Sequence, residues 1–503
     1  MSISALTFYD WAGIATPLFL SLLAIAILII DAYLPRSYAH WLGRFTIWGL
    51  VVILINQMLL HLIRANFSRD VGVGFGGIYY FDNYSIFFNY LFLGAAILSV
   101  ALSLAHLEGK DYNRGEYYVL VLIAAAGMCL LAGARDLIIV FLGLETMSIC
   151  VYVLSGIDRR NLKSNEAALK YLLLGAFATG FLLYGMALLY GVTGATDFQT
   201  LSQNLALLNP GEPRYYMSLV GVGLFLVGFA FKIAAVPFHM WAPDVYEGAP
   251  TPMTAYMATG VKAAGFALLL RIFLTAFVPA WVQTYEVIYV LAVLTMTVGN
   301  FVAISQRNIK RMLAYSSIAH AGYLLVGITA VVASPSIDGA YSAAHSIMFY
   351  LLVYIFMNIG AFAIVIALGR ENRGGEYLED YAGLSVSRPI WAVLMSIFML
   401  SLAGVPPMGG FAGKFYLFQA AINSRLYILT VIAVVNSVIS AYYYLRVIYL
   451  MYMHPEAQFS EPREERGALL TAVALFTAAM TLMLGIFPNN FVLIIWRTFT
   501  TIV

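Results

Sequence analysis

The chain has little charge and almost no cysteine. Lysine, arginine, aspartate and glutamate together make up 10% of its 503 residues, whereas soluble domains carry about 25%. Its two cysteines, Cys129 and Cys150, both fall in apolar stretches and are too few for a disulfide framework or a metal–sulfur cluster. Their expected role is therefore packing. The shortage of charge excludes a soluble protein of this size.

Motifs for nucleotides and redox cofactors are missing as well. The sequence has no P-loop and no cysteine cluster, which phosphate groups and iron–sulfur clusters require. Residues 72–77 formally match G-x-G-x-x-G but lack the strand–helix context of a dinucleotide site, so we expect a turn. No cofactor is expected in this chain. Any driving force must come from an ion gradient or from a partner.

Long hydrophobic runs are what the chain has instead. Hydrophobic residues make up 62% of it, and a helix needs about 20 mostly apolar residues to cross a bilayer. The sequence therefore predicts an all-α integral membrane protein with about fourteen spans. Their approximate bounds are 12–32, 41–63, 84–106, 117–133, 136–155, 167–191, 215–240, 252–277, 283–304, 312–333, 345–369, 390–421, 426–452 and 467–494.

Basic residues are unevenly divided between the loops on the two sides. Most of them lie in one set of alternating loops, which includes Arg159, Arg160 and Lys310, and fewer lie in the other set, which includes Arg271. Loops rich in lysine and arginine stay in the cytoplasm. We therefore expect a multi-pass protein of the inner (plasma) membrane with both termini on the outer, periplasmic side.

Two of the expected spans are interrupted by proline. The seventh has Lys232 followed by Pro237, and the twelfth has Pro406-Pro407 ahead of Lys414. Proline removes a helix donor and clashes with the preceding turn, and irregular backbone at membrane depth is tolerated only where protein or water covers it. Broken helices at corresponding positions in two halves indicate a transport site.

The breaks also suggest internal repeats. Each falls on the fourth helix of a five-helix set, and an odd number of helices turns the second set upside down. We therefore expect two inverted five-helix repeats, at 111–277 and 278–453. Three N-terminal helices at 1–110 precede them, and a C-terminal helix at 454–503 follows.

Several ionisable side chains lie deep within the spans, where each costs at least ~2.5–3.5 kcal/mol. Glu145 and Lys232 lie in equally apolar stretches, so we expect them to pair. A nearby carboxylate favours the ammonium form of a lysine, whereas desolvation favours the neutral amine. Movement of Glu145 would therefore change how tightly Lys232 holds its proton, and the pair would act as a coupled switch. A structural salt bridge is the alternative.

Three further residues are candidates for proton transfer. Lys262 and Lys414 have no acidic neighbour in their own spans, and with apolar neighbours they would favour the neutral amine or share a proton. His320 is a candidate bridge between the halves because imidazole titrates near neutrality, although a satisfied interior histidine is as plausible. Lys170 is either a further relay residue or a side chain that snorkels to the cytoplasmic surface.

Polar residues follow the first break on the expected cytoplasmic side. They are His239, Asp244 and Glu247. They would form either a funnel for proton uptake or polar caps of the loop.

Five motifs resemble a known family. They are "FKIAAVPFHMWAPDVYEGAPTP", "KAAGFALLLR", "SNEAALKYLLLGAFATGFLLYG", "RNIKRMLAYSSIAHAGY" and "AGVPPMGGFAGKFYLF". They resemble the N-type subunits of respiratory complex I, the proton-translocating NADH:quinone oxidoreductase, whose mitochondrial counterpart is chain 2. Among related antiporter-like subunits, the L-type carries a long lateral helix that is not expected here, and the M-type has a glutamate where Lys414 stands.

The resemblance implies roles for particular residues. Glu145, Lys232, Lys262 and Lys414 match the family's residues for proton translocation, and Lys170 falls within a family motif. The implied function is one of several proton channels driven by quinone reduction elsewhere in the complex. NAD, FMN, iron–sulfur clusters and quinone would then belong to the whole complex. The implied partners are an M-type neighbour and small K- and J-type subunits.

Alternatives remain open from the sequence. A subunit of a multi-subunit Na⁺/H⁺ antiporter shares the bundle, and a scaffold subunit would have no proton path of its own. The photosynthetic relatives of complex I also share this subunit type but take electrons from another donor.

Overall fold

A computed structural model describes residues 8–33, 35, 39–67, 72–74, 77–108, 110–369, 375–454 and 467–499. Nearly all of them are helical. Its elements are α1 (Phe8–Tyr33), α2 (Ala39–Phe67), β1 (Gly72–Gly74), β2 (Tyr79–Phe81), α3 (Asn83–Leu107), α4 (Gly115–Gly133), α5 (Leu137–Ser155), α6 (Leu162–Thr193), α7 (Phe198–Ala206), α8 (Pro213–Lys232), α9 (Trp241–Gly248), α10 (Thr251–Tyr256), η4 (Met257–Val261), α11 (Lys262–Leu274), η5 (Val278–Ala280), α12 (Trp281–Ile304), α13 (Ile309–Val332), α14 (Ile337–Leu368), η6 (Leu378–Tyr381), α15 (Leu384–Ser387), α16 (Pro389–Ala403), α17 (Gly409–Asn423), α18 (Tyr427–Met453), α19 (Ala468–Ile486) and α20 (Pro488–Phe499).

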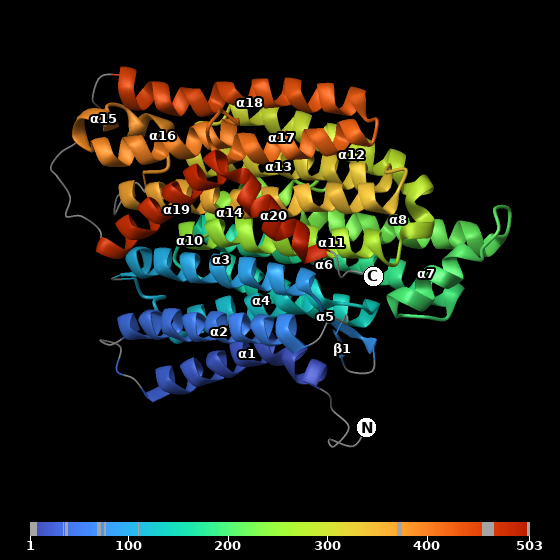
Figure 1. The fold of residues 1–503 in the computed structure, drawn as a ribbon. Coiled ribbons are helices and arrows are strands. Elements are labelled where there is room, and N and C mark those ends of the chain that lie inside the picture. Colours follow the sequence, from blue (N-terminus) through green and yellow to red (C-terminus); the bar gives the residue numbers. More distant parts are fainter. Residues whose placement is uncertain are drawn as a thin grey trace.

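The long helices form one bundle with roughly parallel axes (Figure 1). In the described part of the chain, 13 helices are long and apolar enough to cross a membrane. The shorter helices α16 and α17 together supply one more crossing. The prediction of an all-α membrane protein with about fourteen spans is therefore confirmed. The start of α1 and the end of α20 lie at the same end of the bundle (Figure 1).

Both predicted helix breaks are present. α8 ends at Lys232, and irregular chain leads through residues 233–240 to α9. α16 ends at Ala403, and α17 begins at Gly409. The half-helices α8 and α16 begin at opposite ends of the bundle (Figure 1), which supports the prediction of inverted repeats.

The last predicted span, 467–494, is not one continuous helix. It is divided into α19 and α20, which meet at Phe487 and Pro488. Phe487 has a non-helical backbone, with φ −120° and ψ 48°. The cause is Pro488, because a proline disfavours the helical conformation of the residue before it and is well suited to the first position of a new helix.

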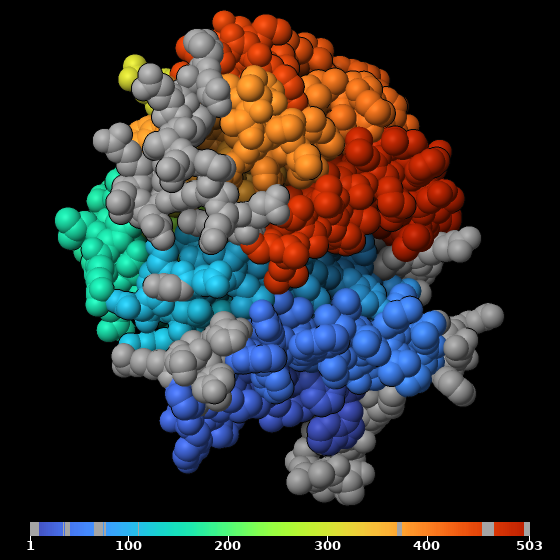
Figure 2. Space-filling view, turned by 90° about the vertical axis from the view of Figure 1, so that its left-hand side faces the viewer, coloured from blue at the N-terminus to red at the C-terminus, as the bar shows by residue number. Residues whose placement is uncertain are grey.

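The outer helices present apolar side chains to their surroundings. Figure 2 views one end of the bundle, with α1 and α2 (blue) at one edge and the second half of the chain (orange) at the opposite edge. On α2, Trp48 is 70% exposed and Val52 is 62% exposed. A soluble monomer would not expose so large an apolar face to water. Lipid or a neighbouring subunit must cover it.

A buried ion pair joins α3 to α11 and was not predicted. The Arg271 guanidinium donates to both carboxylate oxygens of Asp82, at 2.7 and 2.8 Å, and lies against the rings of Tyr80 and Tyr84. Arg271 lies within the predicted span 252–277 but was counted with the basic residues of the outer side, whereas its side chain is buried in the bundle. Asp82 also caps α3 by accepting from the Ser85 N–H.

We expect Asp82→Asn or Arg271→Gln to destabilise the protein by about 3–5 kcal/mol, because each leaves a buried charge without its partner. Thermal unfolding of the purified complex in mild detergent measures the effect. Asp111→Asn is the matched control, since the ion pair of Asp111 with Arg160 is exposed and such pairs contribute about 0–1 kcal/mol. Equal losses in the buried and exposed pairs would contradict this account.

Candidate functional site

Lys232 is buried at the point where α8 breaks. Its ammonium nitrogen donates to the hydroxyls of Ser148, at 2.7 Å, and Tyr152, at 2.8 Å, both on α5. The Trp241 indole N–H donates to the Phe231 carbonyl across the break, at 2.9 Å. This bond ties α9 back onto the last turn of α8. The break therefore holds the lysine against α5.

Glu145 lies on the same helix as both partners of Lys232 but does not touch the lysine. The carboxylate accepts from the Thr179 hydroxyl of α6, at 2.7 Å. Ser148 and Tyr152 follow Glu145 by three and seven residues, which places all three near one face of α5. Although Glu145 and Lys232 both lie in the described part of the chain, they form no ion pair there. Hydroxyl groups therefore bind the Lys232 ammonium, where the sequence predicted direct contact with the Glu145 carboxylate.

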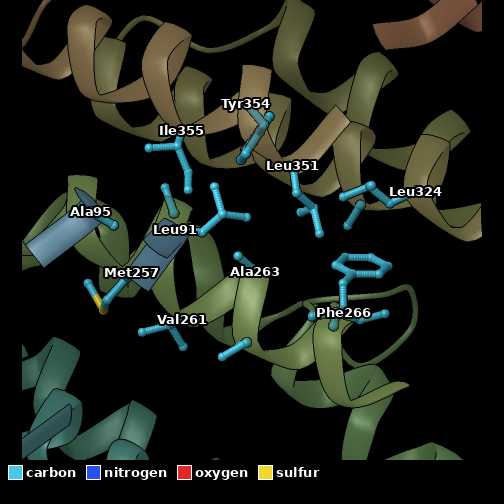
Figure 3. Close-up of a cluster of buried hydrophobic side chains, with 14 of the residues drawn as sticks. Leu91, Ala95, Met257, Val261, Ala263, Phe266, Leu324, Leu351, Tyr354 and Ile355 are labelled. Atoms are coloured by element: carbon cyan, nitrogen blue, oxygen red, sulfur yellow. The ribbon is translucent and has the colours of Figure 1, made fainter. Parts of the chain in front are cut away.

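Lys262 begins α11, directly after the π-helical turn η4. Its ammonium nitrogen donates to the hydroxyl and the carbonyl oxygen of Ser317 on α13. Figure 3 shows the surrounding core, in which Ala263 and Phe266 face apolar side chains of neighbouring helices. Single π-turns are frequent at functional sites, and the sequence analysis missed this one because apolar periodicity does not reveal it.

His320 connects three helices at the centre of the second half. One ring nitrogen, Nδ1, pairs with the Tyr350 hydroxyl of α14, and the other, Nε2, lies 3.1 Å from the Tyr444 hydroxyl of α18. Tyr444 also pairs with the Ser316 hydroxyl of α13. Both tyrosines were missed from the sequence, since Tyr350 and Tyr444 lie 30 and 124 residues from His320 on other helices and no local pattern marks them.

Lys414 lies on α17 beside the second break. Its ammonium nitrogen donates to the carbonyls of Leu402, at 3.0 Å, and Ala403, at 2.9 Å, and to the Ser437 hydroxyl, at 2.9 Å. The expectation of purely apolar neighbours for Lys262 and Lys414 is therefore wrong. The break leaves the last carbonyls of α16 without helical partners, and they become acceptors for the lysine.

One helix, α13, joins the lysines of the two halves. Ser317 accepts from Lys262, and His320 follows one turn later. Tyr323, a further turn along, has its ring centroid 4.9 Å from the Lys414 ammonium nitrogen. Residues three or four apart share a helix face. The structure thus brings Lys262, His320 and Lys414 together along α13.

Lys170 lies apart from this row. Its side chain is 41% exposed and pairs with Glu166 and Asp244, each at 2.6 Å. Asp244 also pairs with Arg311, at 2.7 Å. Burial alone would raise the pKa of Asp244, but the two cations outweigh it and hold that pKa below its ordinary value.

Glu247 extends the same charged cluster. It pairs with Lys163, at 2.7 Å, and with Arg311, at 3.0 Å. Burial would raise the pKa of Glu247, but its two cationic neighbours lower it. Of the two roles predicted for the polar residues after the first break, the structure favours neither over the other. Asp244 and Glu247 connect α9 to α6 and α13 through these ion pairs.

Lys310 is a further residue whose position the sequence analysis did not predict. It was placed in a loop, but its side chain is 3% exposed. The ammonium nitrogen donates to the carbonyls of Glu247 and Ala249, both at 2.7 Å. These carbonyls lie at the C-terminal end of α9, which attracts cations. Asn308 caps the start of α13, and that cap puts Lys310 inside the first turn of the helix.

Metal-ligating side chains do not gather anywhere in the described ranges. No group of three histidine, cysteine, aspartate or glutamate residues there could hold a metal ion. Cys129 and Cys150 are both buried as free thiols. The chemistry that this arrangement offers is transfer of protons between lysine, hydroxyl and imidazole groups.

Comparison with known proteins identifies the family. Residues 134–440 match the family described as NADH:quinone oxidoreductase/Mrp antiporter, transmembrane. NADH-quinone oxidoreductase subunit N of Trichlorobacter lovleyi is 47% identical over 480 residues, which cover 93% of each chain. Subunit N 2 of Rhizobium meliloti is 41% identical and covers 97% of this chain and 98% of its own.

Solved structures agree with these relatives. A chain of respiratory complex I from Thermus thermophilus with bound aureothin is 36% identical, with a TM-score of 0.76 over 95% of this chain and 98% of that one. A chain of the Mrp complex from Dietzia sp. DQ12-45-1b has a TM-score of 0.81 over 97% of this chain and 96% of its own, but at 22% identity it shows a shared fold alone. The predicted resemblance to N-type subunits is confirmed. The chain belongs to the NADH:quinone oxidoreductase/Mrp antiporter transmembrane family, within which its relatives are subunits N.

Proposed function

We propose that this chain is a proton-translocating membrane subunit of an NADH:quinone oxidoreductase. Its part is to carry protons, while electrons pass through other subunits. NAD, FMN, iron–sulfur clusters and quinone belong to those subunits in this proposal. The relatives named as subunit N, at 40–47% identity, support the assignment to the complex.

The observation that carries this proposal is the burial of three lysines inside the bundle. Lys232, Lys262 and Lys414 are each 2–4% exposed. An ionisable group at membrane depth is costly and marks an ion pathway by default. Each of the three has hydroxyl or carbonyl partners rather than a carboxylate at contact distance. Without a fixed counter-ion, such a lysine is free to gain and lose its proton as its surroundings change.

Glu145 is the proposed switch for Lys232. Although the two groups are not in contact, the carboxylate still favours the ammonium form of the lysine, and this influence falls off with separation. Displacement of Glu145 would weaken that influence, and desolvation would then favour release of the proton. The switch requires movement of a charge rather than rupture of an ion pair.

A neighbouring subunit would control Glu145. Its carboxylate is half-buried and lies on the same side of α5 as Leu142 and Ile149, which are 49% and 54% exposed. A carboxylate facing lipid would be very unfavourable. This flank is therefore the proposed contact with an antiporter-like M-type subunit or with the small K- and J-type subunits.

Protons would cross in a defined order. They would be taken up from the cytoplasm near Lys232 or Lys262, pass His320 along α13, and leave to the outside by Lys414. Ile233, in the first break, packs on Gly265 of α11, which brings the two uptake lysines onto adjacent elements. In this orientation both termini lie on the outer side of the plasma membrane.

The switch predicts that Glu145→Gln or Lys232→Met slows proton transfer in this subunit by at least ~10-fold, which corresponds to about 1.4 kcal/mol on the barrier. The protons pumped per quinone reduced should fall in proteoliposomes that contain the assembled complex. Glu166→Gln is the matched control, because this carboxylate pairs with Lys170 outside the row of buried lysines. Wild-type stoichiometry in both switch variants would show the proposal to be wrong, and loss of assembly alone would favour a scaffold.

A second prediction separates Lys170 from the relay. Lys170→Met removes one partner of Asp244, and we expect a loss of at most about 1 kcal/mol because the pair is partly exposed to solvent. The pKa of Asp244 is held low, so this stabilisation is complete above the ordinary aspartate pKa of about 4 and disappears as the pH falls below it.

Thermal stability of the purified complex between neutral and acidic pH measures this effect. The variant should be less stable than wild type at pH ~7, and the difference should shrink as the pH falls below ~4. Proton pumping is expected to continue. A fully assembled Lys170→Met complex that no longer pumps would instead place Lys170 in the relay.

A further inference from the structure

The second break exposes the C-terminal end of α16 inside the bundle. The last carbonyls of a helix have no helical partners, and together they carry a partial negative charge of about half a unit. Leu402 and Ala403 contribute two such carbonyls. Gly404 ends the helix in the left-handed region, with φ 89°, which glycine adopts without steric cost.

Three acceptors converge on one nitrogen at this helix end. The Ser437 hydroxyl joins the two carbonyls at 2.9 Å from Lys414 Nζ. It also directs its own proton toward the Ala403 carbonyl, at 3.4 Å, which leaves its lone pairs to accept from the lysine. A primary ammonium has three N–H donors and no acceptor. The three acceptors therefore match the three N–H donors of a protonated primary amine.

An aromatic ring completes the surroundings of this nitrogen. The ring centroid of Tyr323 lies 4.9 Å from Lys414 Nζ, within the range of an attractive cation–π interaction. The Tyr323 hydroxyl is held by the side-chain amide of Asn300, at 3.1 Å. Asn300 in turn accepts from the Tyr443 hydroxyl, at 2.9 Å. The ring is thus held in place through its hydroxyl.

The other two buried lysines have a different set of partners. Lys232 donates to two hydroxyls, and Lys262 donates to the hydroxyl and carbonyl of a single serine. Neither of these described sites includes the end of another helix. Both also lie over aromatic rings, so the helix-end carbonyls are what distinguish the site around Lys414.

We propose that the C-terminal end of α16, together with Ser437 and the ring of Tyr323, is a binding site for a primary ammonium group, with the side chain of Lys414 as its resident. The consequence for proton transfer rests on the proposed function: the site would hold a proton on Lys414 until it leaves to the outside. Binding of an ammonium group does not itself depend on pumping.

Gly404 keeps this site open. A Cβ atom added there would lie 3.1 Å from Lys414 Cδ and 3.3 Å from its Nζ. Besides this close approach, an L side chain would be strained at the observed φ. Gly404 is therefore a positioning residue, since its lack of a side chain lets the lysine reach the helix end.

Truncation of the resident side chain tests the site directly. Lys414→Ala removes the equivalent of n-propylammonium, so this small cation is the probe. In the purified Lys414→Ala complex we expect n-propylammonium to raise the melting temperature in a saturable way. Propyltrimethylammonium, which has the same charge but no N–H donor, should have no such effect. Wild-type complex, whose site is filled, should respond to neither.

A second substitution connects the response to the proposed acceptors. In the Lys414→Ala/Ser437→Ala complex, n-propylammonium should bind about tenfold more weakly, because one hydrogen bond to a charged group is lost. No response to n-propylammonium in Lys414→Ala, or an equal response to the trimethyl analogue, overturns the site. Saturable binding without any pumping defect in Lys414→Ala would instead keep the site and overturn the proposed function.

If the Lys414→Ala complex does not assemble, Ser437 variants of the otherwise unchanged chain provide the test. Ser437→Ala removes one acceptor and should lower the protons pumped per quinone reduced. Ser437→Thr keeps the hydroxyl and should restore most of that loss. Identical behaviour of the two variants overturns the site, since a purely steric role would not depend on the hydroxyl.

Discussion

A charged side chain inside a membrane needs hydrogen-bond partners supplied by the protein, because the lipid provides none. The structure meets this need largely with groups that helix ends and hydroxyls provide. The end of α16 accepts from Lys414, and the end of α9 accepts from Lys310. The hydroxyls of Ser148 and Tyr152 accept from Lys232. Where a helix is broken, its unpaired end carbonyls thus make a buried lysine tolerable.

The same requirement explains how the two halves of the chain cooperate. α13 belongs to the second half, yet its Ser317 accepts from Lys262 of the first. His320 and Tyr323 then continue the line of polar groups toward Lys414. One helix thus presents a polar face within an apolar core, and the proposed proton route depends on it. Glu145, at the flank, is the proposed point of control by a neighbouring subunit.

Much of this arrangement could be predicted from local sequence. Lys232 and Lys414 stand out because apolar residues surround them, and Pro237 marks a break because proline cannot continue a helix. The partners could not be predicted in the same way. Asp82 and Arg271 are separated by 189 residues, and no local pattern connects positions so far apart. The partners of Lys414 at α16 are backbone carbonyls, which any residue type would supply.

The central claim is that the buried lysines carry protons, and Lys262 offers its most direct test. It lies between the proposed switch at Lys232 and the proposed bridge at His320, and its hydrogen-bond partner is a single serine. The measurement is the number of protons moved per NADH oxidised in proteoliposomes that contain fully assembled Lys262→Leu complex. The account predicts a lower number than in wild type. An unchanged number would contradict it.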